Sequence, residues 1–429
     1  MTLRREDISM SDYDYSLPDK CIAKHPLPKR DASRLLIERN GEIADARFRD
    51  IACFLPKDTL LVFNNSRVLP ARIHFSRETG SIIEIFCLSP VGGNYEVALN
   101  NRDRSAWYCL VGNGKRWKNS PLERRFHIGR KEVLLSAFRE DADNGSSCII
   151  FSWDNPTLTF GEVLDAIGQL PLPPYLNRNA VPQDNRTYQT IYSRIKGSVA
   201  APTAGLHFTA GIFKNLEIAH IDCEEITLHV GAGTFRPVKG DYITTHHMHA
   251  EYFTVTLTAL KHLLASIGNI VAVGTTTVRT LESLYYLGVY ASAGDFCSSP
   301  FNPNLPHVPQ WVPYEPTSNR LTATESIQVL INYMTAHRLT SLSATTQIII
   351  LPTYHPHITR GLITNFHQPR STLLLLIAAY TRHWRSLYNH ALANGYRFLS
   401  YGDACLLLPE NNDCDTRPDF NLLSKLPLS

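Results

Sequence analysis

The chain has 429 residues, of which 44% are hydrophobic and 19% charged, and its formal net charge is +3 at pH 7. This length exceeds one comfortable hydrophobic core and predicts two domains of ordinary globular composition. The net charge is too small to indicate a nucleic-acid partner by itself. The longest apolar run, residues 373–380, is too short to cross a bilayer.

Nine cysteines are present, without a Cys-x-x-Cys pair or a metal-ligand spacing, and the first residues carry no apolar signal core. Cysteines of this kind are typical of reduced thiols in a cytoplasmic protein. We therefore expect a cytoplasmic protein with no membrane segment, and a monomer.

The elements begin with a buried strand at residues 58–67 that runs into a polar turn. From residue 71 to residue 154 the apolar residues follow a period of two, broken by Gly and Asn turns. We predict short strands here at 81–88, 95–99, 107–111, 131–138 and 147–153. Such a series is typical of a small barrel or sandwich.

After residue 158 helices and strands alternate again. Helical spacing predicts helices at 159–167 and 277–287, and buried strands are expected at 270–273 and in the segment that ends at Gly231. Six prolines between 300 and 316 predict an irregular extended segment. A capping box at Thr322–Glu325 then predicts a helix at 323–337.

Four blocks rich in small residues and hydroxyls stand out, at 199–208, 228–235, 273–283 and 362–367. Glycines after an apolar run let backbone N–H groups approach a ligand closely. Four such blocks predict one composite pocket.

Two of these blocks allow more than one interpretation. The Gly-Ala-Gly at 231–233 fails as a dinucleotide fingerprint, because Arg236 takes the third glycine position and Pro237 follows it. It forms either a strand end whose amides face a polar ligand or a tight turn. Residues 274–279 form a helix start suited to a carboxylate or phosphate. Arg279 and Glu282 lie three residues apart and share one helix face. They either belong to a binding site or form only an ion pair within the helix.

Each of three histidines, His207, His229 and His367, lies in one of these blocks. They are candidates for proton transfer or for holding ribose hydroxyls, although a single histidine is usually structural. The carboxylate of Asp403 follows another strand-like segment. Two further histidine groups, 246–249 and 355–357, lack metal-site partners, so we predict no metal site.

Residues 100–131 form a basic patch with nine Lys or Arg against two acids. Aromatic residues lie between the cations: Trp107, Tyr108, Trp117 and Phe126. This composition suits phosphate contacts and base stacking, but the alternating faces of a solvated sheet produce the same pattern.

Nine stretches together resemble the S-adenosylmethionine:tRNA ribosyltransferase-isomerase family of queuosine biosynthesis. They are residues 60–72, 170–175, 188–192, 200–208, 229–235, 246–252, 274–283, 362–367 and 396–404. The resemblance implies an α/β main domain (1–70 and 155–429) with an inserted small β-barrel domain (71–154). It also implies that S-adenosylmethionine is a consumed substrate, that no cofactor is needed, and that tRNA is the partner.

The implied reaction moves the ribosyl moiety onto 7-aminomethyl-7-deazaguanine in tRNA, forming epoxyqueuosine and releasing adenine and methionine. On this resemblance His229 or His367 is the base, with Glu282 and Asp403 as further catalytic candidates. The implied substrate-binding residues are Thr203, Gly205, His207, Gly231, Gly233, Thr234, Thr275, Arg279 and Asn365. The implied tRNA-binding residues are Lys115, Arg116, Arg124, Arg125, Arg130 and Lys131.

Family members have a short connection where this chain runs from 288 to 345, and Thr353 replaces their usual glycine. We therefore expect an atypical insertion over 288–345. It keeps open two alternatives: a diverged paralogue that binds RNA or nucleoside without turnover, and an enzyme that uses the same donor on another acceptor.

Overall fold

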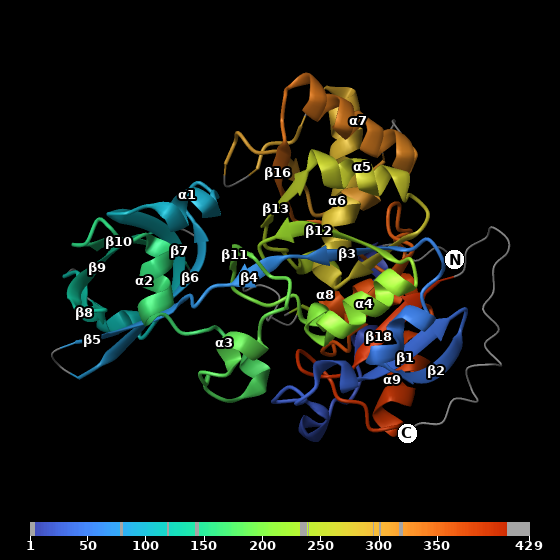
Figure 1. Ribbon diagram of the computed structural model, residues 1–429, viewed down its shortest axis with the longest axis horizontal. Helices are drawn as coiled ribbons and strands as arrows, with labels where there is room; N and C mark the ends of the chain where they lie inside the picture. The colour runs from blue at the N-terminus through green and yellow to red at the C-terminus, as the bar shows by residue number, and fades with distance from the viewer. Residues whose placement is uncertain are drawn as a thin grey trace.

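The computed structural model describes residues 5–77, 80–117, 120–141, 146–231, 238, 240–294, 296–299, 302–316 and 321–409. A ten-stranded sheet flanked by helices forms the larger part, and a six-stranded antiparallel sheet lies to one side of it (Figure 1). The protein is thus a mixed α/β structure with a second, barrel-like sheet.

The large sheet has the strand order β15-β16-β13-β12-β3-β14-β17-β18-β1-β2. Its strands are β1 (Arg34–Arg39), β2 (Glu42–Arg47), β3 (Leu60–Asn64), β12 (Asp222–Leu228), β13 (Glu251–Thr256), β14 (Ile270–Val273), β15 (His307–Val308), β16 (Ser341–Thr346), β17 (Gly361–Asn365) and β18 (Ala404–Leu408). The four central strands β12, β3, β14 and β17 are parallel. Their carboxyl ends therefore share one edge of the sheet.

Helices cover both faces of this sheet. They are α4 (Ala210–Ile218), α5 (Leu257–Ala265), α6 (Thr275–Ala293), α7 (Ala323–Ala336), α8 (Thr372–Tyr380) and α9 (Trp384–Ala393). The short helix α3 (Asp184–Thr187) lies apart from this sheet (Figure 1). Successive residues of β3 enter different cores: Val62 belongs to the core that includes α5, α6 and α7, and Phe63 contacts Phe213 of α4 in the core on the other face. This is the period of two expected of a strand buried on both faces.

The six-stranded sheet has the order β5-β6-β7-β10-β9-β8. Its strands are β5 (Arg72–Ser76), β6 (Ile82–Pro90), β7 (Arg104–Gly112), β8 (Leu122–Ile128), β9 (Lys131–Asp141) and β10 (Ser147–Trp153). The edge strands approach each other, since Arg124 Nη1 on β8 donates to the carbonyl of His74 on β5 at 2.9 Å. The sheet is nearly closed.

Helix α2 (Phe160–Ile167) packs into the core of this barrel-like sheet. Phe160, Val163 and Leu164 are fully buried there beside Trp107 and Phe151. The packing of the barrel therefore continues past the boundary predicted at residue 154. A short parallel pair, β4 (Ser66–Val68) with β11 (Ile195–Ser198), lies between the two sheets.

The structure confirms most predicted elements but corrects residues 95–99, which were predicted as a strand. They form helix α1 (Tyr95–Asn100). The side chain of Asn94 caps the helix by accepting from the backbone N–H of Val97 at 3.0 Å. Tyr95, Ala98 and Leu99 are buried at helical spacing. The cap and this spacing outweigh the alternation that predicted a strand.

The proline-rich segment is largely irregular, as predicted: its described residues 302–316 contain the two-residue strand β15 and a 3₁₀ turn at Val312–Tyr314. The rest of the region 288–345 is more regular. Helix α6 continues to Ala293, and β15 and β16 extend the large sheet at one edge. The predicted capping box is present at α7, where Thr322 and Glu325 each bind the other's backbone N–H. Of the helices in the described part of the chain, none combines the length and the apolar character needed to span a membrane.

Candidate functional site

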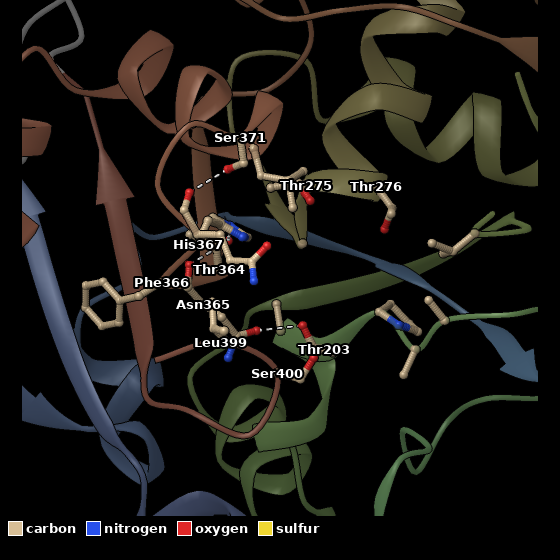
Figure 2. Close-up of a pocket in the computed structure, with 18 of the residues that line it drawn as sticks. Thr203, Thr275, Thr276, Thr364, Asn365, Phe366, His367, Ser371, Leu399 and Ser400 are labelled. Atoms are coloured by element: carbon tan, nitrogen blue, oxygen red, sulfur yellow. Dashed lines mark hydrogen bonds between the residues drawn. The ribbon is translucent and has the colours of Figure 1, made fainter. Parts of the chain in front are cut away.

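A polar pocket, here called the central pocket, lies where several strand ends and loops meet (Figure 2). It is lined by residues 200–204, 274–276, 364–368, 371–373 and 399–400, with Tyr175, Tyr188 and Val230. Each of the four small-residue blocks therefore contributes at least one residue, as the predicted composite pocket requires.

The topology explains this convergence. Parallel neighbours β14 and β17 end at Val273 and Asn365, so the segments after them emerge at the same edge of the sheet. Gly274 makes the turn into α6 with φ +93°, a backbone conformation that suits glycine. Ligands of open α/β sheets bind at such carboxyl edges.

A chain of hydrogen bonds runs from the central pocket into the core. Thr203 Oγ1 donates to Asn365 Oδ1 at 2.9 Å (Figure 2). Asn365 Nδ2 lies 3.1 Å from His207 Nε2, and His207 Nδ1 lies 2.8 Å from Ser33 Oγ. Because the amide nitrogen of Asn365 can only donate, His207 Nε2 is the acceptor and Nδ1 carries the proton.

Burial lowers the pKa of His207 to about 4, so the ring is neutral at pH 7. Its neutral tautomer keeps the amide of Asn365 in one orientation. The Thr203 hydroxyl donates its proton in the hydrogen bond to Asn365. Its oxygen lone pairs are left to accept a hydrogen bond from a ligand hydroxyl or amino group in the pocket. His207 itself does not line the central pocket, so it positions Asn365 rather than contacting a ligand there.

The first turn of α6 gives the pocket an electropositive wall. Thr275 and Thr276 are buried and line it, and Thr276 Oγ1 has no hydrogen-bond partner within the described part of the chain. The first N–H groups of a helix lack partners within the helix and carry a partial positive charge. This wall therefore offers hydrogen bonds to a polar or anionic group, as predicted for residues 274–279.

His367 also lines the central pocket. Its Nε2 lies 2.8 Å from Thr364 Oγ1, and its backbone N–H donates to Tyr388 Oη at 3.0 Å. The hydroxyl of Tyr15 donates to its carbonyl. Burial lowers the pKa of His367 to about 3, so the ring is neutral and able to accept a proton.

His229 lies in a different cavity, of about 790 Å³, between the barrel-like sheet and the large sheet. Its ring stacks on Tyr95 with centroids 4.2 Å apart, and its buried Nδ1 has no hydrogen-bond partner among the residues that the structure describes. A Cβ on Gly197 would lie 2.2 Å from this nitrogen, so Gly197 makes room for the ring. Burial lowers the pKa of His229 to about 4.

Neither of the two predicted catalytic carboxylates lines a described pocket. Glu282 is fully buried and accepts five hydrogen bonds, from Tyr354, His357, Ile358 and, twice, Thr359. Asp403 accepts from the backbone N–H groups of Arg34 and Arg397 and from the Arg397 guanidinium. Both carboxylates hold loops together.

Arg279 does not pair with Glu282, as one alternative for this helix face required. It forms a buried ion pair with Glu251 instead, and it lines a smaller cavity beside the central pocket. Gly231 donates its N–H to Glu251 Oε1 at 2.9 Å. Glu251, at the start of β13, was not predicted as a site residue.

The remaining predicted glycines and Thr234 divide into two cases. Gly205 does not line the central pocket: a Cβ there would lie 1.9 Å from Tyr192 Oη, so its role is close packing. Gly233 and Thr234 lie outside the described residues.

Sequence reasoning missed several pocket residues. Ser371 caps α8 and brings Thr372 and Leu373 to the pocket wall. Leu399 adopts a left-handed conformation with φ +69°, which is costly for a branched residue and typical of binding sites. Its backbone N–H donates to Phe366 at 3.1 Å. No composition signal marks Leu399.

The predicted tRNA-binding cations separate into two groups. Five of them are exposed: Lys115, Arg116, Arg125, Arg130 and Lys131. Arg124 is half-buried and bridges β8 to β5, and burial lowers its pKa. The aromatic residues Trp107, Trp117 and Phe126 are buried in the barrel core. They are therefore not accessible for stacking on RNA bases, and that alternative is wrong for these three residues.

The histidine groups do not gather into a metal site. Among the described residues, no group of three or more His, Cys, Asp or Glu is arranged to hold a metal ion. His246 and His249 line the small cavity with Arg279, and the ring of His357 stacks on Tyr285 at 3.7 Å.

These features define an α/β protein with a polar pocket at a sheet edge and a basic barrel-like sheet beside it. A family model described as "Queuosine biosynthesis protein" matches residues 10–306 and 315–407. The chain belongs to this family. Of the region 288–345, the model leaves only residues 307–314 unmatched.

Two curated relatives carry the name S-adenosylmethionine:tRNA ribosyltransferase-isomerase. One, from Halothermothrix orenii, is 34% identical over 94% of this chain and 100% of its own length. The other, from Syntrophomonas wolfei, is 36% identical over 94% of this chain and 99% of its own length. A solved S-adenosylmethionine tRNA ribosyltransferase from Thermotoga maritima is 25% identical, covering 92% of this chain and 100% of that chain, with a TM-score of 0.43.

Proposed function

We propose that this protein transfers the ribosyl moiety of S-adenosylmethionine to 7-aminomethyl-7-deazaguanine in tRNA, forming epoxyqueuosine and releasing adenine and methionine. The observation that carries the proposal is the meeting of all four predicted blocks at one pocket, in a chain 34% and 36% identical to enzymes of this name over nearly its whole length. A paralogue without turnover is not favoured, because the region that suggested it is largely matched by the family model.

The central pocket receives the nucleoside part of the donor. Its enclosed volume is about 80 Å³, below the roughly 300–1,000 Å³ of typical small-molecule sites. The nucleoside therefore occupies the open mouth as well as the enclosed part. Thr203 accepts from a ribose hydroxyl or an amino group, and the first turn of α6 supplies donors beside it.

His367 is the base that removes a proton beside the sulfonium. Its ring is neutral because burial holds its pKa near 3. Two hydrogen bonds fix its backbone: the carbonyl accepts from the Tyr15 hydroxyl, and the N–H donates to Tyr388 Oη. The sulfonium acidifies the adjacent C–H. A pKa near 3 lies below the range that best suits a general base at neutral pH, so the assignment rests on the position of the ring in the central pocket and not on its basicity. Adenine leaves with a proton, the aminomethyl nitrogen of the tRNA base forms a C–N bond to the ribosyl group and releases a proton, and methionine leaves with the electron pair of its C–S bond as a ribosyl oxygen closes the epoxide.

The exposed cations of the barrel-like sheet bind tRNA phosphates. This sheet is a domain inserted into the α/β domain: all its strands come from residues 72–153, and its core includes α2, so it extends to about residue 168. The protein acts as a cytoplasmic monomer. The free thiols of the eight described cysteines fit that compartment. S-adenosylmethionine is a substrate, and we expect no cofactor.

The test is adenine release. Purified protein is incubated with S-adenosylmethionine and tRNA that carries 7-aminomethyl-7-deazaguanine, and adenine is measured by chromatography. Matched tRNA with guanine at that position is the control. We expect adenine and epoxyqueuosine only with the modified tRNA. Absence of both products, while donor and tRNA each bind, would overturn the proposal.

A further inference from the structure

A second cavity, here called the side pocket, adjoins the central pocket, and Thr372 and Leu373 line both. It is lined by the charged residues Arg279 and Glu251 and by apolar side chains that include Met248, Ile349 and Leu376. An elongated ligand in the central pocket has a neighbouring space into which its other end can extend.

Arg279 is buried, with 7% of its surface exposed, and only part of its hydrogen-bonding capacity is used. Nη1 pairs with Glu251 Oε2, and Nε donates to the carbonyl of Ile348 at 3.1 Å. Nη2 is buried and has no partner among the described residues. A buried guanidinium nitrogen without an acceptor is costly, and it marks a place for an anion.

Glu251 supplies the opposite charge beside it. Its side chain is 4% exposed, and its Oε1 already accepts from Gly231. Each oxygen of a carboxylate can accept more than one hydrogen bond, so a cation next to Glu251 finds free lone pairs. The pair as a whole is neutral, and it matches a ligand group that carries one positive and one negative charge.

We infer that the side pocket binds the α-amino-acid end of the donor, with its carboxylate on Arg279 Nη2 and its ammonium group beside Glu251. This inference rests on the proposed function. Met248, Ile349 and Leu376 then cover the methylene groups between the zwitterion and the sulfonium, and Thr372 and Leu373 lie at the passage between the two pockets.

The first experiment uses the unaltered protein and three ligands, with affinity measured by calorimetry. S-adenosylmethionine carries the whole zwitterion, its decarboxylated form lacks the carboxylate, and 5′-methylthioadenosine lacks the amino-acid end. A charge-assisted hydrogen bond predicts that the decarboxylated form binds about tenfold or more weakly than S-adenosylmethionine. Equal affinity for these two ligands would overturn the inference.

The second experiment uses Arg279→Lys, which keeps a cation for Glu251 but removes the forked guanidinium. We expect about tenfold weaker binding of S-adenosylmethionine and unchanged binding of 5′-methylthioadenosine. Arg360→Lys, at an exposed position, is the matched control. Equal loss of both ligands by a folded Arg279→Lys protein would assign the ion pair a purely structural role.

The outcomes separate this inference from the proposed function. A protein that releases adenine but does not distinguish the decarboxylated donor refutes only the side pocket assignment. A protein that binds none of the three ligands refutes both. If Arg279→Lys does not fold, the three-ligand comparison with the unaltered protein decides alone.

Discussion

His229 and Val230 are consecutive residues that line different cavities. His229 lies in the large cavity beside the barrel-like sheet, and Val230 lies in the central pocket. Successive side chains of an extended segment point to opposite sides. The two histidines proposed as alternative bases, His229 and His367, are therefore in separate cavities, and only His367 lies in the central pocket.

This separation predicts different effects of the two histidines on the chemical step. We expect His367→Asn to lower kcat for adenine release by about 10²–10⁴-fold, the range for loss of a general base, with donor affinity little changed. His229→Asn is expected to retain kcat within about tenfold in its folded fraction. The reverse order in single-turnover assays would make His229 the base.

The chain from Thr203 through Asn365 to His207 predicts a binding effect. Asn365→Leu removes the hydrogen bonds that the amide makes with Thr203, with His207 and with the carbonyl of Asp403, and it frees the Thr203 hydroxyl to rotate. We expect donor KM to rise about tenfold, one to two kcal/mol of lost hydrogen bonding. Ser33→Ala, which touches only the far end of the chain, is the control and should change KM much less. Equal effects would contradict positioning through Asn365.

The five hydrogen bonds to Glu282 predict a folding role. Glu282→Gln keeps the size of the side chain but puts an NH₂ group where an oxygen accepted donors, so some buried donors lose their partner. We expect a loss of about 3 kcal/mol in the free energy of unfolding by urea. The kcat of the folded enzyme should stay unchanged. A large loss of kcat at full stability would instead restore Glu282 as a catalytic residue.

The three buried histidines predict how stability depends on pH. Burial lowers the folded-state pKa of His207 and His229 to about 4 and of His367 to about 3, whereas an unfolded histidine titrates near pH 6.5. Above pH 6.5 all three are neutral in both states. Below it the unfolded state binds more protons, so stability falls as pH drops from about 6.5 to about 4.

The size of this loss can be measured. Below its folded-state pKa, each histidine accounts for a loss on the order of 3 kcal/mol (His207 and His229) to 5 kcal/mol (His367) in the free energy of unfolding. We expect urea unfolding between pH 7 and pH 4.5 to show a shallower decline for His207→Gln than for the unaltered protein. His127→Gln, at an exposed position, is the matched control and should leave the slope unchanged. Identical slopes for all three proteins would contradict a buried, neutral His207.

Patterns local to the sequence predicted the structure well where local forces decide it. The Thr322–Glu325 capping box located α7, and the glycine after a buried strand located the start of α6. The same locality failed at Tyr95, where an alternating pattern hid a capped helix. The convergence at the central pocket was predictable because neighbouring parallel strands end at one edge.

Long-range pairings were not predictable in this way. Arg279 lies on a helix and Glu251 on a strand, 28 residues apart in the sequence. The local pattern of neither segment indicates that the two residues pair. Leu399, in its left-handed conformation, donates its backbone N–H to the carbonyl of Phe366, 33 positions earlier in the chain. The alternation around Trp107 and Phe126 showed two faces of a sheet, but only closure of the barrel determined that the aromatic face is inside.

The exposed cations of the barrel-like sheet predict salt-dependent tRNA binding. Reversal of Lys115, Arg116, Arg125, Arg130 and Lys131 to Glu should weaken tRNA binding and flatten its dependence on salt, because each phosphate contact releases counterions. S-adenosylmethionine binding, in a distant pocket, should not change.

Arg124→Gln is the comparison variant. It removes a hydrogen bond between the barrel edges and should lower the stability of the protein more than its affinity for RNA. Filter binding at several salt concentrations measures the affinity for tRNA and its salt dependence, and urea unfolding measures the stability of Arg124→Gln. Unchanged affinity of the fivefold variant would reassign these cations to ordinary surface.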